Sequence, residues 1–289
     1  MANTPNISRD SFDYTKWYNQ VVLQQGVPVM DSDWNELGDI QFFRDVLKSA
    51  HVLGNLLLPA DVNDEQSFYA PGYSIQEAAS PTNNFSITGG WAVCHGLMVP
   101  TVATYPPTDH DYEDDTNRMG EGAVSSVDGG AVTISDDEKN WQTFHNLAGC
   151  RVKMTSGAES GNIFTVVART NATTLQLNSV GSISASDTYI VKPPAITTPS
   201  AFREDTIYLM VWIEDISEVE DSVLTHPGTG ICSAHRKQIR WCVRIEEDGP
   251  SPDTPDVHDI SSAGGVRYMF LASVVRETGI TDITDATIE

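Results

Sequence analysis

The sequence predicts a mainly β protein with an N-terminal helical arm, in which a β-sandwich or barrel domain carries an inserted small β-barrel domain. Three observations carry this prediction. One amphipathic helical stripe lies near the N-terminus, short β-rich runs separated by Gly, Pro, Asn and Asp follow Pro59, and no helical stretch lies between those runs. Strands at such spacing are typical of small barrels and sandwiches.

The N-terminal region is expected to hold a corner and then a helix. Residues 17–24 read as a strand or a short helix, and Gly26 with Pro28 marks the turn after them. Asp33 is a suitable helix N-cap, and Glu36 completes a capping-box pattern. Apolar residues then recur at three- and four-residue spacing, in Trp34, Leu37, Ile40, Phe43, Leu47 and on to about Leu53.

The remainder of the chain is expected to form strands. Each candidate run is rich in β-branched and aromatic residues and is bounded by turn-forming residues. These runs are 85–100, 131–135, 150–156, 162–170, 173–178, 187–193, 206–216, 238–247 and 267–277.

Two linker-like segments divide this β region. Residues 104–122 are acidic and carry two prolines, and 193–200 are rich in Pro and Thr. They bracket a block with its own strands, which indicates an insertion. The expected domains are an arm and helix at 1–58, a discontinuous β domain at 59–122 and 196–289, and an inserted β domain at 123–195. A further polar stretch, 246–259, is expected to be an exposed loop.

Composition narrows the classes of function. Lys and Arg total 17 against 40 for Asp and Glu, which gives a net charge of −23. Such a charge repels phosphate backbones and anionic lipids, so nucleic acid is not an expected partner. No run is apolar for the ~20 residues that a membrane span needs, and the first residues lack the features of a secretory signal. We therefore expect assembly in the cytoplasm.

The four cysteines, Cys94, Cys150, Cys232 and Cys242, lack the spacing of a zinc site. In a reducing cytoplasm they are expected to be buried free thiols. Pairing of Cys232 with Cys242 stays open if the protein later meets an oxidising environment.

Two acidic clusters are candidates for chemistry. Carboxylates at 109–115 could bind Ca²⁺, but the alternating calcium-loop pattern is missing, so a solvated acidic loop is favoured; its ionisable members are Asp109, His110, Asp111, Glu113, Asp114 and Asp115. The stretch DSDWNE at 31–36 could hold a general acid–base pair. Helix capping and the helix dipole explain its carboxylates better.

No catalytic or cofactor-binding motif is present. The sequence lacks G-x-S-x-G, H-E-x-x-H and a P-loop, and its seven histidines are scattered. We expect no cofactor and no metal. The tryptophans in or beside the predicted strands are expected to pack in cores rather than stack on sugars.

The beginning of the chain, SRDSFDYTKWYNQVVLQQGVPVMDSDWNEL, resembles the N-terminal signature of a family of virion proteins from tailed phages and contractile injection systems. In that family a Q-Q-G-x-x-x-x-D-x-D-W-N-E run leads into a helix. The matching positions here are Gln24, Gln25, Gly26, Asp31, Asp33, Trp34, Asn35 and Glu36.

Other blocks are similar to proteins of the same kind. FSITGGWAVCHGLMV resembles an early hairpin of baseplate and fibre proteins, although Cys94 and His95 depart from its pattern. DTIYLMVWIEDISEVEDSVL with HRKQIRWCVRI resembles a paired-strand block, and GITDITDATIE the ends of fibre-attachment segments. The inserted region resembles a small β module common in phage structural proteins, through Trp141, Leu147, Gly149, Thr155, Gly157 and Gly161.

The resemblance implies a structural component of a phage tail, either a baseplate protein or a tail-fibre adaptor, located in the virion. Expected partners are other tail, baseplate or fibre proteins and further copies of the chain, with a trimer as one option. The arm could add a strand to a neighbour's sheet. The expected docking residues, within 12–53, are Trp17, Tyr18, Gln24, Gln25, Gly26, Asp31, Asp33, Trp34, Asn35, Glu36, Ile40 and Phe43.

Two alternatives remain open at this stage. A host-receptor or carbohydrate-binding tail module would use exposed loops such as 104–122 or 246–259. A particle-associated hydrolase would use carboxylates of the acidic loops on cell-wall or capsular sugar.

Overall fold

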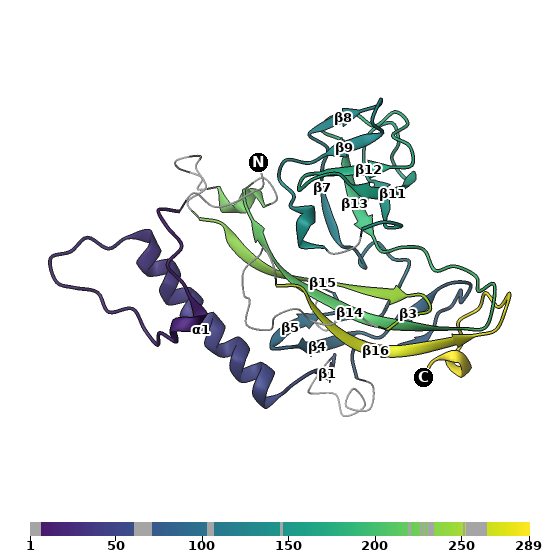
Figure 1. Cartoon of the computed structure of the whole chain (residues 1–289), viewed down its shortest axis with the longest axis horizontal. Coiled ribbons are helices and arrows are strands. Elements are labelled where there is room, and N and C mark those ends of the chain that lie inside the picture. The colour runs from purple at the N-terminus through teal and green to yellow at the C-terminus, as the bar shows by residue number, and fades with distance from the viewer. Residues whose placement is uncertain are drawn as a thin grey trace.

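The computed structural model describes residues 7–60, 71–102, 107–144, 147–218, 221–225, 228, 230, 234–250, 252 and 265–289. Within these ranges the chain forms one long helix, short 3-10 turns and four antiparallel sheets, one of which is a curled seven-stranded half-barrel (Figure 1). The expected mainly β class with an N-terminal helix is therefore confirmed.

The helix α1 (Asp31–Val52) begins two residues before the predicted cap. Met30 is the N-cap, and the Asp33 carboxylate accepts from Met30 N at 3.2 Å within the first turn. The prediction that Asp33 is the N-cap is therefore wrong. Asp33 instead satisfies a backbone N–H at the helix start from inside the helix.

The inner face of α1 packs on a small sheet. Ile40, Phe43 and Val46 are buried on this face. The sheet has the strand order β1-β4-β5, built from β1 (Leu56–Pro59), β4 (Gly90–Cys94) and β5 (Leu97–Pro100). Gly96, in the β4–β5 turn, has a φ of +89°, and a Cβ there would lie 2.2 Å from Val46 O. Only glycine lets the hairpin approach the helix so closely.

A second three-stranded sheet has the order β2-β3-β6. Its strands are β2 (Ile75–Glu77), β3 (Phe85–Ile87) and β6 (His110–Asp111). The short strand β6 brings the acidic segment at 109–115 onto the body of the protein, because His110 and Asp111 pair in register with Ile87 and Ser86.

The longest strands form the central sheet, in the order β15-β14-β16. They are β14 (Arg203–Ile216), β15 (Arg236–Glu246) and β16 (Arg267–Arg276). The sequence IYLMVWI of β14 is almost uniformly apolar. Both faces of this sheet are covered, so the side chains on either face are buried and apolar.

The half-barrel is built from residues 120–192. Its order is β7-β13-β10-β11-β12-β9-β8. The strands are β7 (Gly120–Ala123), β8 (Ser126–Asp128), β9 (Thr133–Ser135), β10 (Arg151–Met154), β11 (Ile163–Arg169), β12 (Thr174–Leu177) and β13 (Thr188–Lys192). In the described part of the chain, 3-10 turns also form at η3 (Trp141–Thr143), η4 (Ser222–Leu224) and η5 (Asp285–Thr287).

Two hydrophobic cores lie on opposite faces of the central sheet. Alternate residues of β14 enter the first core with α1 and the two small sheets, namely Ile207, Leu209, Val211 and Ile213. The intervening residues Tyr208, Met210 and Trp212 enter the second core, which the half-barrel fills. Phe144 of the half-barrel packs edge-on against Trp212, with ring centroids 5.0 Å apart. The half-barrel is therefore seated on the body by apolar packing.

Every predicted β run contains at least one strand. The strand or helix expected at 17–24 is wrong, since that segment has no regular structure. The expected loop at 246–259 lies mostly outside the described residues, and its described residues 247–250 form a turn.

Candidate docking surface

The N-terminal arm, residues 7–30, runs beside α1 and then swings out in a wide loop before the chain enters that helix (Figure 1). One 3-10 turn, η1 (Tyr14–Lys16), interrupts it. Three aromatic rings of the arm pack around Phe43, with centroid distances of 5.7, 6.0 and 6.1 Å, from Phe12, Tyr14 and Trp17. This aromatic cluster fixes the first half of the arm on the helix.

Two serine–carboxylate contacts close the arm against the start of α1. Ser8 donates from its backbone N–H to Asp31 Oδ2 at 2.8 Å, and its hydroxyl donates to the other carboxylate oxygen. Ser11 Oγ donates to Glu36 Oε2 at 2.6 Å. The hydroxyl and backbone of Ser8 hold the pKa of Asp31 below its ordinary value, because both favour the charged carboxylate. We call these contacts the clasp.

The carboxylates of the DSDWNE stretch therefore have two different structural roles. Asp31 and Glu36 serve the clasp, and Asp33 serves the first helical turn. Trp34, predicted as the first residue of the apolar stripe and as a docking residue, is 63% exposed, and Asn35 is exposed beside it. The helix packs on the body only from its second turn, so the first turn leaves its tryptophan in solvent.

The loop at 17–30 contains no charged residue, although the chain as a whole carries −23. Its tip is the turn at Gln24–Gly26, where Gly26 has a φ of +80°. Between residues 18 and 23 the backbone makes no hydrogen bond to another described residue. Large apolar side chains are nevertheless exposed along and beside this loop, at Trp17, Tyr18, Val22, Leu23, Val27, Val29, Met30 and Trp34.

The twelve expected docking residues do not share one environment. Ile40 and Phe43 are buried at 2% and 5% exposure, so they attach α1 to the body. The residues that are exposed are Trp17, Tyr18, Gln24, Gln25, Gly26, Asp31, Trp34 and Asn35, of which Asp31 is engaged in the clasp. We call residues 17–30 with Trp34 the docking loop. The sequence prediction did not include the apolar members Val22, Leu23, Val27, Val29 and Met30, because residues 17–24 were expected to form a strand or short helix.

The acidic segment at 109–115 is only partly the solvated loop that the sequence favoured: Asp109, Asp114 and Asp115 are exposed, but His110 is buried and two carboxylates are ion-paired. Arg151 Nη1 lies 2.5 Å from Glu113 Oε2, and Lys153 Nζ lies 2.5 Å from Asp115 Oδ2. Lys192 reaches both carboxylates, at 3.9 and 3.4 Å. These cations lie side by side because Arg151 pairs in register with Lys192 across β10 and β13. The alternating basic residues of these strands were the sequence signal for this contact.

Partial burial disfavours charge on Asp115, but its ion pairs with Lys153 and Lys192 outweigh that effect and lower its pKa. The described residues hold no group of three or more His, Cys, Asp or Glu that could bind a metal. Glu113 and Asp115 bind protein cations, whereas Asp109, Asp111 and Asp114 accept hydrogen bonds from N–H groups of the protein.

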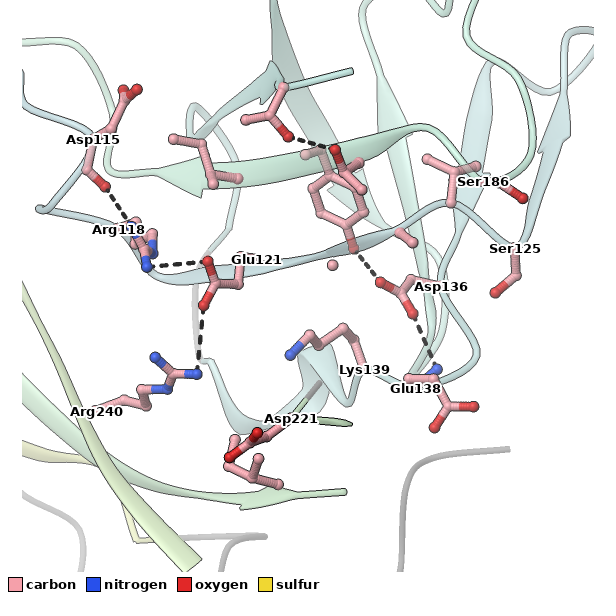
Figure 2. Close-up of a pocket in the computed structure, with 18 of the residues that line it drawn as sticks. Asp115, Arg118, Glu121, Ser125, Asp136, Glu138, Lys139, Ser186, Asp221 and Arg240 are labelled. Atoms are coloured by element: carbon pink, nitrogen blue, oxygen red, sulfur yellow. Dashed lines mark hydrogen bonds and ion pairs between the residues drawn. The ribbon is translucent and has the colours of Figure 1, made fainter. Parts of the chain in front are cut away.

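A cleft of about 1020 Å³, with charged and hydroxyl side chains among its lining residues, opens between the half-barrel and the ends of β14 and β15 (Figure 2). Glu121 of β7 lies between Arg118 at 3.0 Å and Arg240 at 3.6 Å. Arg240 and Lys139 both also pair with Glu214, at 3.1 and 2.9 Å. The ion pairs Glu121–Arg240 and Lys139–Glu214 thus join the half-barrel to the central sheet across this cleft.

Asp136 is the most buried carboxylate of this cleft, at 3% exposure. Burial raises its pKa, and hydrogen bonds from Tyr189 Oη at 2.8 Å and Glu138 N at 3.0 Å partly offset the effect. A Cβ on Gly122 would meet Asp136 Oδ2 at 2.1 Å, so the carboxylate fills the space that this glycine leaves. Asp136 is therefore a structural acceptor rather than a free acid or base.

Three cysteines, Cys94, Cys150 and Cys242, are buried free thiols, as expected. Burial raises the pKa of Cys94 to about 12, so it stays protonated at neutral pH. Cys232 lies outside the described residues, and its pairing with Cys242 stays an open prediction. None of the described helices is long and apolar enough to cross a membrane.

Comparison with known proteins gives no match: no family model, no curated protein and no solved structure is significantly similar to this chain.

Proposed function

We propose that this protein is a non-enzymatic structural component of a bacteriophage tail, either a baseplate protein or a tail-fibre adaptor, that binds a neighbouring tail protein through the docking loop. One observation carries the proposal. Eight of the nineteen large apolar side chains exposed in the described chain lie within residues 17–34. Exposed apolar patches of this kind mark interaction sites, and aromatic residues are enriched at their centres.

The structure of the arm suits a binding role. The clasp and the aromatic cluster around Phe43 hold both ends of the loop, which lowers the entropy lost when a partner orders it. Its unpaired backbone at 18–23 can add a strand to a partner's sheet, while Val22 and Leu23 enter apolar pockets. The resemblance of the Gln24–Glu36 signature to tail proteins supports a partner within the virion.

Point variants test this proposal better than deletion of residues 1–53, because that deletion would uncover the core beneath Phe43 and Val46. The triple change Val22→Gln, Leu23→Gln and Trp34→Gln removes apolar side chains that face solvent. Because these side chains are exposed in the free protein, the variant should fold normally. Burying one such side chain in a partner contributes about 1.5–3 kcal/mol, so the variant should be lost from purified particles.

The matched control changes Phe202→Gln and Phe270→Gln, which are 61% and 55% exposed elsewhere on the body. This control should enter particles as the unchanged protein does. Particles that contain the triple variant at full occupancy would disprove docking through this loop.

A second candidate, a carbohydrate-binding tail module, is favoured by the cleft alone. Hydroxyl groups of Ser125, Thr155 and Ser186 line it beside paired carboxylates and guanidinium groups, a combination that can hydrogen-bond sugar hydroxyls. Binding of the full chain to a glycan array, lost on Ser125→Val with Ser186→Val, would support it.

A further inference from the structure

Residues 109–115, which we call the strap, join the central body to the half-barrel. On the body side β6 pairs with β3, and Tyr112 N donates to Phe85 O at 2.9 Å. On the half-barrel side Glu113 and Asp115 bind the basic residues of β10 and β13. Tyr112 Oη also donates to Pro194 O at 2.8 Å, in the segment that leaves the half-barrel. The strap therefore touches three parts of the chain.

His110 is the buried anchor of the strap on the body. Its side chain is 6% exposed, and its ring lies 5.4 Å from the Trp241 ring of β15. Neither ring nitrogen makes a hydrogen bond with good geometry within the described chain, although the Thr108 backbone lies near enough to favour the charged form. A neutral imidazole tolerates this apolar contact, whereas an imidazolium would lose hydration without gaining a partner.

The charged groups around His110 come from its own segment. Asp114, Asp111 and Asp109 act on it and favour its protonation. The residues that contact it from β3 and β15, Ile87 and Trp241, carry no charge. Burial outweighs the three carboxylates and lowers the pKa of His110 below its ordinary value.

We propose that residues 109–115 form an acid-released strap: when His110 takes up a proton from solvent, the segment leaves β3 and its hold on the half-barrel loosens. The released imidazolium then lies in water near three aspartates, which stabilise it. The half-barrel remains seated on the body by the apolar contact of Phe144 with Trp212. Release therefore loosens the junction without separating the two bodies.

Both ends of the strap respond to acid in the same direction. His110 has a lowered pKa in the folded protein, so the unfolded strap binds the proton first and the closed state loses stability as the pH falls below about 6.5. Asp115 also has a lowered pKa, so its ion pairs persist above the ordinary aspartate pKa and are lost as the pH falls through the lowered value. Histidine acts first, at milder acidity.

Hydrogen exchange of the full chain, corrected for intrinsic rates, tests the proposal at about pH 7.5 and about pH 5, on either side of the ordinary histidine pKa. Amides of 109–115 should exchange roughly 10-fold faster at the lower pH, because protonation of buried His110 disfavours the closed strap. His110→Phe keeps an aromatic ring on Trp241 and cannot be protonated. It should remove most of this acceleration.

His51→Phe is the matched control, since His51 is exposed near the end of α1. It should leave the acceleration unchanged. Equal acceleration in His110→Phe and the unchanged protein would overturn the proposal, as would no acceleration in the unchanged protein. If His110→Phe does not fold, the NMR titration of His110 in the unchanged chain decides: strap amide shifts that do not follow its protonation also overturn it.

Discussion

At the scale of single residues, the positions most sensitive to substitution are those where two segments of the chain are in close contact. Gly96 abuts Val46 O, and Gly122 abuts the Asp136 carboxylate. Arg276 and Asp205 form an ion pair at 3.0 Å in which neither side chain is exposed. Sequence patterns could not identify these positions, because each depends on a residue far away in the chain.

Gly96→Ala should lower the free energy of unfolding by about 2 kcal/mol or more, since it adds a clash to the cost of a positive φ. Gly161→Ala is the matched control, because its φ is +88° and no atom lies within 4 Å of the added Cβ. The control should lose only about 1 kcal/mol. Urea denaturation measures both, and equal losses would argue against the tight contact between the hairpin and α1.

At the scale of elements, α1 contacts both the arm and the body: its start binds the arm through the clasp, and Phe43 lies between the arm and the body. The motif that leads into α1 predicted a helix correctly to within two residues at its start. It did not show that Asp31 and Glu36 bind serines 23 and 25 residues upstream. Nor did it show that Trp34 stays outside, because a helical period cannot say where packing on the body begins.

Asp31→Asn should open the clasp and make the bond after Lys16 a faster site of trypsin cleavage in the full chain. The amide accepts less strongly than the carboxylate and has lost one acceptor oxygen. The contact has a matching dependence on pH. Because the pKa of folded Asp31 is lowered, the clasp is present above the ordinary value and is lost as the pH falls through the lowered one.

Asp45→Asn is the control for that experiment, since Asp45 is an exposed carboxylate on the same helix that pairs only weakly with Lys48 at 3.5 Å. It should not change cleavage after Lys16. If both variants are cleaved at the rate of the unchanged protein, the clasp does not hold the arm.

At the scale of the whole molecule, one sheet with two apolar faces organises everything else. The strands of this sheet and of the half-barrel centre overlap predicted runs, because their own apolar and β-branched residues indicate a strand. The strands β7 and β8, with sequences GEGA and SVD, escaped prediction. Their partners β13 and β9 impose the extended form on residues with little preference for it.

Phe144→Ala should weaken the packing of the half-barrel on the central sheet. The free energy of unfolding should fall by about 3–5 kcal/mol, as for other truncations of buried aromatic residues. We expect the thermal transition to broaden or split, because the two cores would no longer melt together. Phe202→Ala, at an exposed position, should leave the transition unchanged. A single sharp transition at the original temperature in both variants would count against the shared second core.

The absence of charge in the docking loop has a consequence for how ionic strength acts on association. Two copies of a chain with net charge −23 repel each other over a Debye length of about 10 Å at 0.1 M salt. A contact between two copies through the valine, leucine and tryptophan side chains of this loop would have no charge attraction for counter-ions to screen. We therefore expect added salt to favour such a contact between two copies, the reverse of its effect on a complex held by opposite charges.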